Sequence, residues 1–131
     1  MPRWTKEQEL AINQENTNIL VSAGAGSGKT AVLSERALRK VKENVNIDEI
    51  LILTFTKAAA YEMMLRIRKK IQENGFQEQV NRIDKAYITT FDSFALSIVK
   101  KYHDRLNLKK EVSIIDEHAI NLVKTELLDE I

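Results

Sequence analysis

Ala23-Gly24-Ala25-Gly26-Ser27-Gly28-Lys29-Thr30 is the stretch that decides the fold. It follows a short apolar run, residues 18–22, and it precedes a helical pattern that begins at Lys29. The order is therefore strand, glycine-rich loop and helix. The glycines let backbone N–H groups turn toward an anion, and the helix adds its positive end at the same place. The stretch predicts a phosphate-binding loop, and so a site for a nucleoside triphosphate.

Each part of this loop has an expected role. Lys29 would neutralise the outer phosphates of ATP, and the Thr30 hydroxyl would complete the coordination shell of a Mg²⁺ ion, so ATP and Mg are the expected cofactors and these two residues the expected catalytic ones. The usual pattern opens with glycine where this chain has Ala23. A glycine-rich turn ahead of an ordinary helix is the alternative. The nucleotide-binding residues expected in the loop are Ala23, Gly24, Ala25, Gly26, Ser27, Gly28, Lys29 and Thr30.

The length and composition of the chain limit its fold and its partners. The chain has 131 residues, which is enough for one domain with a single core. Its net charge is only +1, so any nucleic-acid site must be local. It has no cysteine, which excludes disulfides and cysteine metal sites and fits a cytoplasmic protein. No apolar run is long enough to cross a bilayer, so we expect no membrane contact.

Strand and helix patterns alternate along the chain. Thr5 followed three residues later by Gln8 has the spacing of a capping box at the start of the first helix. Because repeated strand–helix units build parallel sheets, we expect an α/β fold with a parallel sheet flanked by helices. The expected strands are residues 18–22, 49–55, 86–90 and 112–115, and the expected helices are residues 5–13, 29–42, 57–73 and 93–105 and a last one from 117 onward.

Four segments, in this order, resemble superfamily 1 DNA helicases. They are Trp-Thr-Lys-Glu-Gln at 4–8, the loop at 23–30, Leu-Thr-Phe-Thr-Lys-Ala-Ala-Ala-Tyr-Glu-Met at 53–63 and Thr-Phe-Asp-Ser-Phe at 90–94. The chain is similar to the UvrD/Rep/PcrA group and to its RecB and AddA relatives, and most similar to the AddA type, which is the A subunit of an ATP-dependent helicase/nuclease. The resemblance implies a RecA-like P-loop NTPase fold, with residues 1–131 as the N-terminal part of the first ATP-binding domain, incomplete at the C-terminus.

The resemblance also assigns residues to base and DNA recognition. Gln8 matches a glutamine that reads the adenine ring, a task for which an amide can both donate and accept. Phe55, Thr56 and Lys57 match a segment that holds single-stranded DNA, in which Phe55 offers a stacking face and Thr56 a hydroxyl for a phosphate. Most family members have Asn where this chain has Lys57. From periodicity alone, Phe55 is nearly as well explained as a core aromatic residue.

A second DNA-contacting segment matches Thr90 and Phe91. The family usually has His where this chain has Asp92, and a carboxylate repels a phosphate chain, so we expect Asp92 to cap the following helix instead. In the helix 57–73, Met63 and the isoleucines four and eight residues later predict a core face. Its basic residues at 66 and 68–70 predict a solvated face, with a track for a phosphate backbone as the alternative.

Asp116 and Glu117 follow the apolar run 112–115 and look like the motif in which Asp holds Mg²⁺ and Glu polarises the attacking water. The resemblance argues against this role, because the Asp-Glu motif of these helicases lies much further along. Asp116 is then better explained as a helix N-cap. The competing interpretation is a compact and complete P-loop NTPase that uses this pair.

The expected function follows from the resemblance. The full-length protein would be an ATP-dependent helicase that translocates on single-stranded DNA in repair or recombination, with single-stranded and double-stranded DNA as its partners. An AddA-type protein would add a nuclease domain and an AddB-like partner subunit. We expect residues 1–131 alone to bind nucleotide weakly and hydrolyse little of it. A UvrD/PcrA-type helicase without a nuclease, the compact NTPase, and an adaptor that keeps the fold only for interaction are the alternatives.

Overall fold

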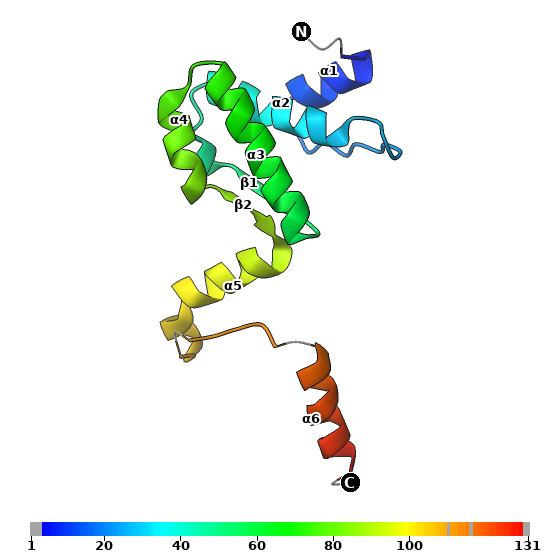
Figure 1. The fold of residues 1–131 in the computed structure, drawn as a ribbon, viewed down its shortest axis with the longest axis vertical. Coiled ribbons are helices and arrows are strands. Elements are labelled where there is room, and N and C mark those ends of the chain that lie inside the picture. The colour runs from blue at the N-terminus through cyan, green and yellow to red at the C-terminus, as the bar shows by residue number, and fades with distance from the viewer. Residues whose placement is uncertain (1–3, 110, 116, 130–131) are drawn as a thin grey trace. The chain divides into compact units, whose positions relative to one another are not determined.

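The computed structural model describes residues 4–109, 111–115 and 117–129. The chain divides into two compact units, Met1–Thr90 and Phe91–Ile131. The first unit is a mixed α/β structure around a small parallel sheet, as expected (Figure 1). Its elements are α1 (Lys6–Asn13), α2 (Lys29–Lys42), β1 (Leu51–Thr54), α3 (Lys57–Glu73), α4 (Gln77–Arg82) and β2 (Tyr87–Thr90), with short 3₁₀ turns at Ile47–Glu49 and Ile83–Lys85.

The sheet and α3 organise the core of this unit. β1 and β2 pair in parallel, with Leu51 opposite Tyr87 and Thr54 opposite Thr90. Helix α3 packs against α2 and against both strands. The predicted core face of α3 is confirmed, since Met63 and the two isoleucines after it are buried. The buried apolar cluster consists of Ala37, Leu38, Val41, Ile47, Ile52, Met63, Ile67, Ile71, Val80 and Ile83.

The helix boundaries follow local capping signals. The predicted capping box of α1 is present, because the Gln8 N–H donates to Thr5 Oγ1 and the Thr5 N–H donates to Gln8 Oε1. Helix α3 begins after Thr56, whose Oγ1 accepts from the Ala59 N–H at 3.1 Å. It ends at Glu73 with Asn74 as its C-cap, and the next residue, Gly75, has a φ of 81°, the left-handed conformation that stops helices. These signals explain why α1 and α3 match their predicted ranges.

The strand predicted at residues 18–22 is wrong. Among the described residues the sheet contains β1 and β2, and residues 18–22 do not belong to it. A strand requires a hydrogen-bonded neighbour, and an apolar run alone does not supply one. The apolar residues of this run are also exposed, with Leu20 97% exposed, whereas a strand covered on both faces would be buried.

The second unit contains α5 (Phe91–Lys101), a 3₁₀ turn at His103–Leu106 and α6 (Glu117–Asp129). The strand predicted at 112–115 is wrong for the same reason, since residues 111–115 are irregular and Ile114 and Ile115 are exposed. Asp92 does not cap α5, because the helix already begins at Phe91; it lies in the first turn, where a negative charge is favourable. Asp116 lies outside the described residues, and Glu117 is the first residue of α6.

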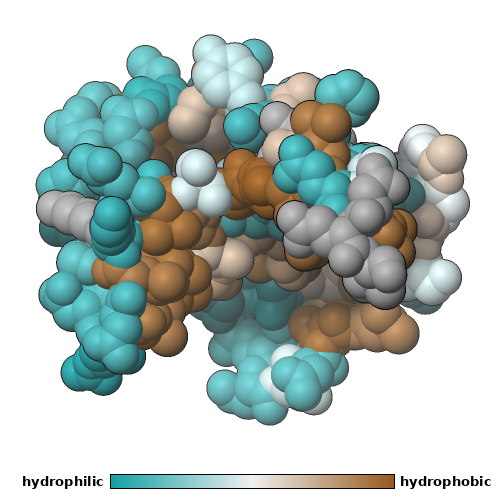
Figure 2. All heavy atoms as spheres, turned by 90° about the horizontal axis from the view of Figure 1, so that it is seen from below, coloured by the Kyte–Doolittle hydropathy of each residue, from teal (hydrophilic) through white to brown (hydrophobic). Residues whose placement is uncertain are grey.

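Apolar side chains also reach the surface of the molecule. Figure 2 shows hydrophobic groups, in brown, among the hydrophilic ones in teal. In the first unit they include Leu20, Phe55 and Tyr61. No helix among the described residues is both long and apolar enough to cross a bilayer.

Candidate nucleotide site

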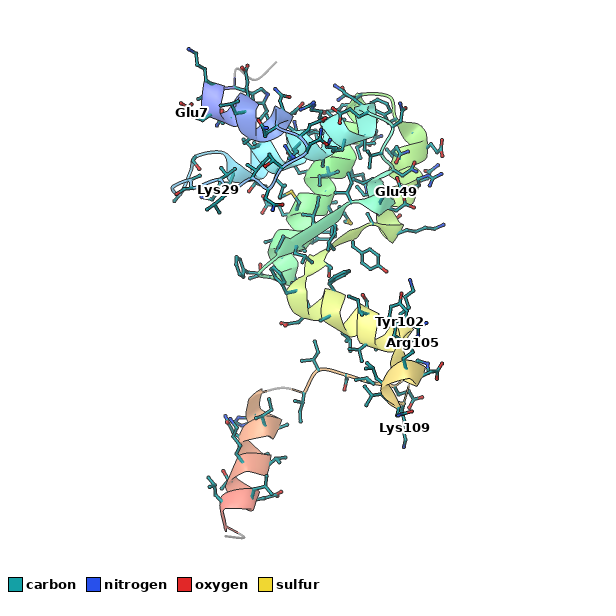
Figure 3. The ribbon with its side chains drawn as sticks, turned by 180° about the vertical axis from the view of Figure 1, so that it is seen from behind. Glu7, Lys29, Glu49, Tyr102, Arg105 and Lys109 are labelled. Atoms are coloured by element: carbon teal, nitrogen blue, oxygen red, sulfur yellow. The ribbon has the colours of Figure 1, made fainter. Side chains whose placement is uncertain are left out.

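A cavity of about 590 Å³ lies in the first unit, between α1, the glycine-rich loop and the first two turns of α2. Its volume is in the range of small-molecule sites. Ile19, Val32 and Leu33 give it apolar walls, while Gln8 and Lys29 bring polar groups. Figure 3 shows Lys29 where the loop passes into α2. An apolar wall beside a cationic loop is the combination that a nucleotide needs, with the base on one side and the phosphates on the other.

The loop takes the backbone conformation that its glycines predict. Gly26 and Gly28 have φ angles of 74° and 82°, in the left-handed region that favours glycine. Gly28 is also the N-cap of α2, so the helix begins directly after the loop. The first backbone N–H groups of a helix have no partner inside it, and here they lie next to the loop. Ala23 is not among the residues with positive φ, which explains why its position does not need glycine.

The Lys29 ammonium lies over the loop. Its Nζ donates to the Ala23 carbonyl at 2.9 Å and to the Gly24 carbonyl at 2.6 Å, while Ser27 Oγ donates to the same Gly24 oxygen at 2.7 Å. An ammonium has three donors, so a further one can reach a phosphate oxygen. Thr30 follows in the first turn of α2 with an exposed side chain, and a hydroxyl next to the loop lysine fits a Mg²⁺ ion held with a phosphate.

Gln8 joins α1 to the loop. Its Oε1 accepts from the Thr5 N–H at 2.9 Å, and its Nε2 donates to the Ser27 carbonyl at 3.1 Å. A side-chain amide has two N–H donors and two acceptor lone pairs, so each of these contacts leaves a second donor or acceptor. Gln8 therefore retains the donor–acceptor pair that an adenine edge requires.

Glu7 of α1, labelled in Figure 3, contributes a negative charge to the lining of the cavity. The N–H of Glu7 itself, at the start of α1, and the Thr5 hydroxyl hold the pKa of the Glu7 carboxyl below its usual value. The carboxylate is therefore ionised at neutral pH. Because it would repel a triphosphate, Glu7 favours the base and sugar side of a ligand.

We expect Gly28→Ala to weaken nucleotide binding sharply. A Cβ at Gly28 would lie 3.3 Å from Gln8 Nε2, and the φ of 82° is strained for alanine. The substitution thus disturbs both the loop and the side chain that contacts it. Gly75→Ala is the matched control, since Gly75 lies outside the loop, also has a positive φ of 81°, and its Cβ would meet nothing within 4 Å. Titration with a fluorescent ATP analogue checks this; equal losses in both variants would contradict the assigned roles.

The residues predicted to contact DNA lie at the carboxyl end of the sheet. Phe55 follows β1 and is 94% exposed, which excludes the alternative of a core aromatic residue. Thr56 caps α3, and Lys57 is the first residue of that helix. Because Thr54 and Thr90 are opposite each other in the parallel pair, residues 55–57 and the end of β2 share one edge. Thr90 is only 7% exposed, so this residue of the edge is buried.

Phe91, which begins the second unit, is also exposed. In α3, the basic residues at 66 and 68–70 each have an acidic neighbour, which favours an ion-paired helix face over a track for phosphates. The pairs are Arg66–Glu62, Arg68–Asp84, Lys69–Glu73 and Lys70–Glu35. Among the residues with described positions, no group of three His, Cys, Asp or Glu side chains could hold a metal ion.

Sequence reasoning missed Arg36, which lines the same cavity. Its guanidinium donates to backbone carbonyls at the end of α1, the helix that carries Gln8. The available signal was its spacing: seven residues after Lys29, Arg36 lies two turns along on the same face of α2.

The amino-acid sequence is similar to those of several named proteins. Three similar relatives are each named as the A subunit of an ATP-dependent helicase/nuclease: those of Heliobacterium modesticaldum (43% identical over 99% of the chain), Lactobacillus helveticus (43% over 100%) and Acetivibrio thermocellus (44% over 98%). The matched region is 10%, 12% and 11% of their respective lengths, so the chain spans about a tenth of these relatives. Residues 4–131 match the UvrD/REP helicase N-terminal domain. The chain therefore belongs to the family of the UvrD/REP helicase N-terminal domain.

Proposed function

We propose that residues 1–131 are the ATP-binding N-terminal part of the first RecA-like domain of a DNA helicase, of the AddA type found in helicase–nucleases. The observation that carries this proposal is the joining of Lys29, the glycine-rich loop and Gln8 around one cavity of about 590 Å³. The family match and the names of the relatives support the helicase activity. In this proposal the catalytic residues within the chain are Lys29 and Thr30.

ATP would lie along this cavity with its phosphates at the loop. Lys29 and the first N–H groups of α2 would bind the β- and γ-phosphates, and Gln8 would bind the adenine edge. Thr30 is the residue that would hold Mg²⁺, which supplies charge neutralisation for phosphoryl transfer when it is bound. Val32 and Leu33 line the cavity and would give the nucleotide apolar contacts. This chain thus holds the nucleotide, and we assign the attack of water to residues beyond those in this segment.

DNA would bind at the carboxyl edge of β1. Phe55 offers an exposed ring for stacking, Thr56 a hydroxyl and Lys57 a positive charge for the backbone. Closure of two lobes around ATP would then move single-stranded DNA across this edge. In this proposal the protein works in the cytoplasm on DNA, with a second subunit of the AddB kind. The compact NTPase is disfavoured, because the strand it needs at 112–115 is not formed.

The test compares the complete gene product with the chain of residues 1–131 alone. We expect the complete product to hydrolyse ATP faster when single-stranded DNA is present, because nucleotide and DNA sites are coupled in a translocating enzyme. The chain alone should bind a fluorescent ATP analogue and show little turnover. Rapid, DNA-independent hydrolysis by residues 1–131 alone would instead support the compact NTPase.

Replacing Phe55 by alanine should weaken single-stranded DNA binding about fivefold to a hundredfold, since stacking on an aromatic ring is worth about 1–3 kcal/mol per base. The unfolding midpoint should change little, because Phe55 is 94% exposed. Fluorescence anisotropy of a labelled oligonucleotide measures the affinity. Phe55→Trp is the control and should retain binding; a loss as large as in the alanine variant would exclude stacking as the cause.

A further inference from the structure

Helix α1 is too short to be stable without contacts to the rest of the chain. It has eight residues, Lys6–Asn13, and isolated helices below about 12–15 residues are marginal in water. Its buried residues are Ala11 and Ile12, both near its end. Yet this helix carries Gln8 at the cavity. The placement of Gln8 therefore depends on what fixes the two ends of α1.

Arg36 of α2 fixes the C-terminal end of α1. Its Nη1 donates to the Ala11 carbonyl at 2.8 Å and to the Ile12 carbonyl at 3.2 Å, and its Nη2 donates to the Gln14 carbonyl at 2.8 Å. The last carbonyls of a helix have no partner inside it. The guanidinium supplies both the missing donors and the positive charge that this end of a helix favours.

Arg39, one turn further along α2, also donates hydrogen bonds to the same C-terminal end of α1. Its Nη1 donates to the Ile12 carbonyl at 3.3 Å and to Asn13 Oδ1 at 3.1 Å. The residues that form the last turn of α1, at positions 10–13, are Leu-Ala-Ile-Asn, so the cations come from α2. Of the two arginines, Arg36 makes the shorter backbone contacts, and it lines the cavity.

Helix α2 connects the loop, at its first residue, to the arginine that contacts α1. Lys29 begins α2, and Arg36 lies seven residues later on the same face, about 10.5 Å along the axis. The other end of α1 contacts the loop through Gln8 Nε2 and the Ser27 carbonyl. The position of Gln8 relative to Lys29 therefore depends on the two turns of α2 between Lys29 and Arg36, on the contacts of Arg36 with α1, and on the contact of Gln8 with Ser27.

We propose that Arg36 is a positioning residue for nucleotide-base recognition: it holds α1 so that Gln8 faces the base of a nucleotide whose phosphates lie at the loop. This inference rests on the proposed function, in which the cavity binds ATP and Gln8 reads adenine. Arg36 itself acts through backbone carbonyls and does not touch the nucleotide in this assignment.

A positioning role for Arg36 predicts different effects on two ligands that would both bind at the loop, one with a base and one without. Loss of the guanidinium lowers the fraction of molecules in which Gln8 is in place, and the apparent dissociation constant rises in inverse proportion to that fraction. For Arg36→Ala we expect the affinity for Mg–ATP to fall about fivefold to tenfold, as when the competent fraction drops to about 10–20%. The affinity for Mg–tripolyphosphate, which has no base, should not change.

The experiment is calorimetric titration of the complete gene product with Mg–ATP and with Mg–tripolyphosphate. The variants are Arg36→Ala, Gln8→Ala and the double variant, with Arg66→Ala as a matched arginine control on α3. We expect the double variant to bind ATP no more weakly than Gln8→Ala, since both changes remove the same contact. Arg36→Lys keeps the charge but loses the two-nitrogen fork, and should lose part of the ATP affinity.

Equal losses for ATP and tripolyphosphate in Arg36→Ala, or additive losses in the double variant, would overturn the positioning role and leave a general effect on the fold. Wild-type affinity for ATP in both Arg36 variants would also overturn it. Failure of the underlying function is distinguishable, because the wild-type protein would then bind neither ligand, or would bind both equally.

Discussion

Lys29→Ala is expected to lower ATP turnover by about two to three orders of magnitude, the usual effect of removing one group that stabilises developing negative charge. Its ammonium is already over the loop, held by the Ala23 and Gly24 carbonyls. Alanine would leave the phosphates without this positive charge. Hydrolysis by the complete gene product, measured with and without single-stranded DNA, checks the effect.

Lys42→Ala is the matched control for this substitution. It removes an exposed lysine from the last turn of the same helix, α2, far along the axis from the loop. Turnover should remain at the wild-type level. Hydrolysis by the Lys29 variant at a rate close to that of the Lys42 variant would mean that the nucleotide is processed elsewhere in the protein.

Ile67→Ala should give a large loss of stability, about 2–5 kcal/mol in the free energy of unfolding, as found for buried aliphatic residues cut back to alanine. Ile67 is fully buried in the cluster that joins α2, α3 and the sheet. The cavity left behind has little means of collapsing, because helices and strands enclose it. Urea denaturation followed by far-ultraviolet circular dichroism measures the loss.

Leu65→Ala, two residues earlier on α3, serves as the comparison. Leu65 is 44% exposed, so shortening it removes less contact and leaves no closed cavity. We expect a loss below about 1 kcal/mol, which is usual for surface positions. Similar losses for the two variants would mean that α3 does not present the face described above to the core.

Helices α1 and α3 were predictable because their signals are local. Thr5 and Gln8 stand three residues apart, so the capping box of α1 can be recognised without knowing anything else about the fold. In the same way, Gly75 ends α3 with its positive φ whatever the helix packs against. The conformation of the loop at Gly26 and Gly28 also follows from the residue types alone.

The features that sequence reasoning missed depend on distant partners. An apolar run such as 18–22 or 112–115 has the composition of a strand whether or not a neighbour pairs with it, and here neither run belongs to the sheet. Periodicity could not decide between burial and exposure for Phe55, which lies just beyond the last ladder residue of β1. Arg36 donates to backbone carbonyls of residues more than twenty positions away. Every residue has a backbone carbonyl, so the residue types do not indicate which ones Arg36 contacts.

The contacts of α1 also change the entropy of the segment that follows it. The Gln14 carbonyl is tied to Arg36, and Ser27 is tied to Gln8, so residues 15–26 form a loop whose two ends are already fixed. Most of the entropy lost on closing such a loop is lost when its ends meet, and only a slowly growing part depends on its length. When a nucleotide orders the glycines of this loop, both ends of residues 15–26 are therefore already fixed. The free energy needed to order the loop is correspondingly smaller.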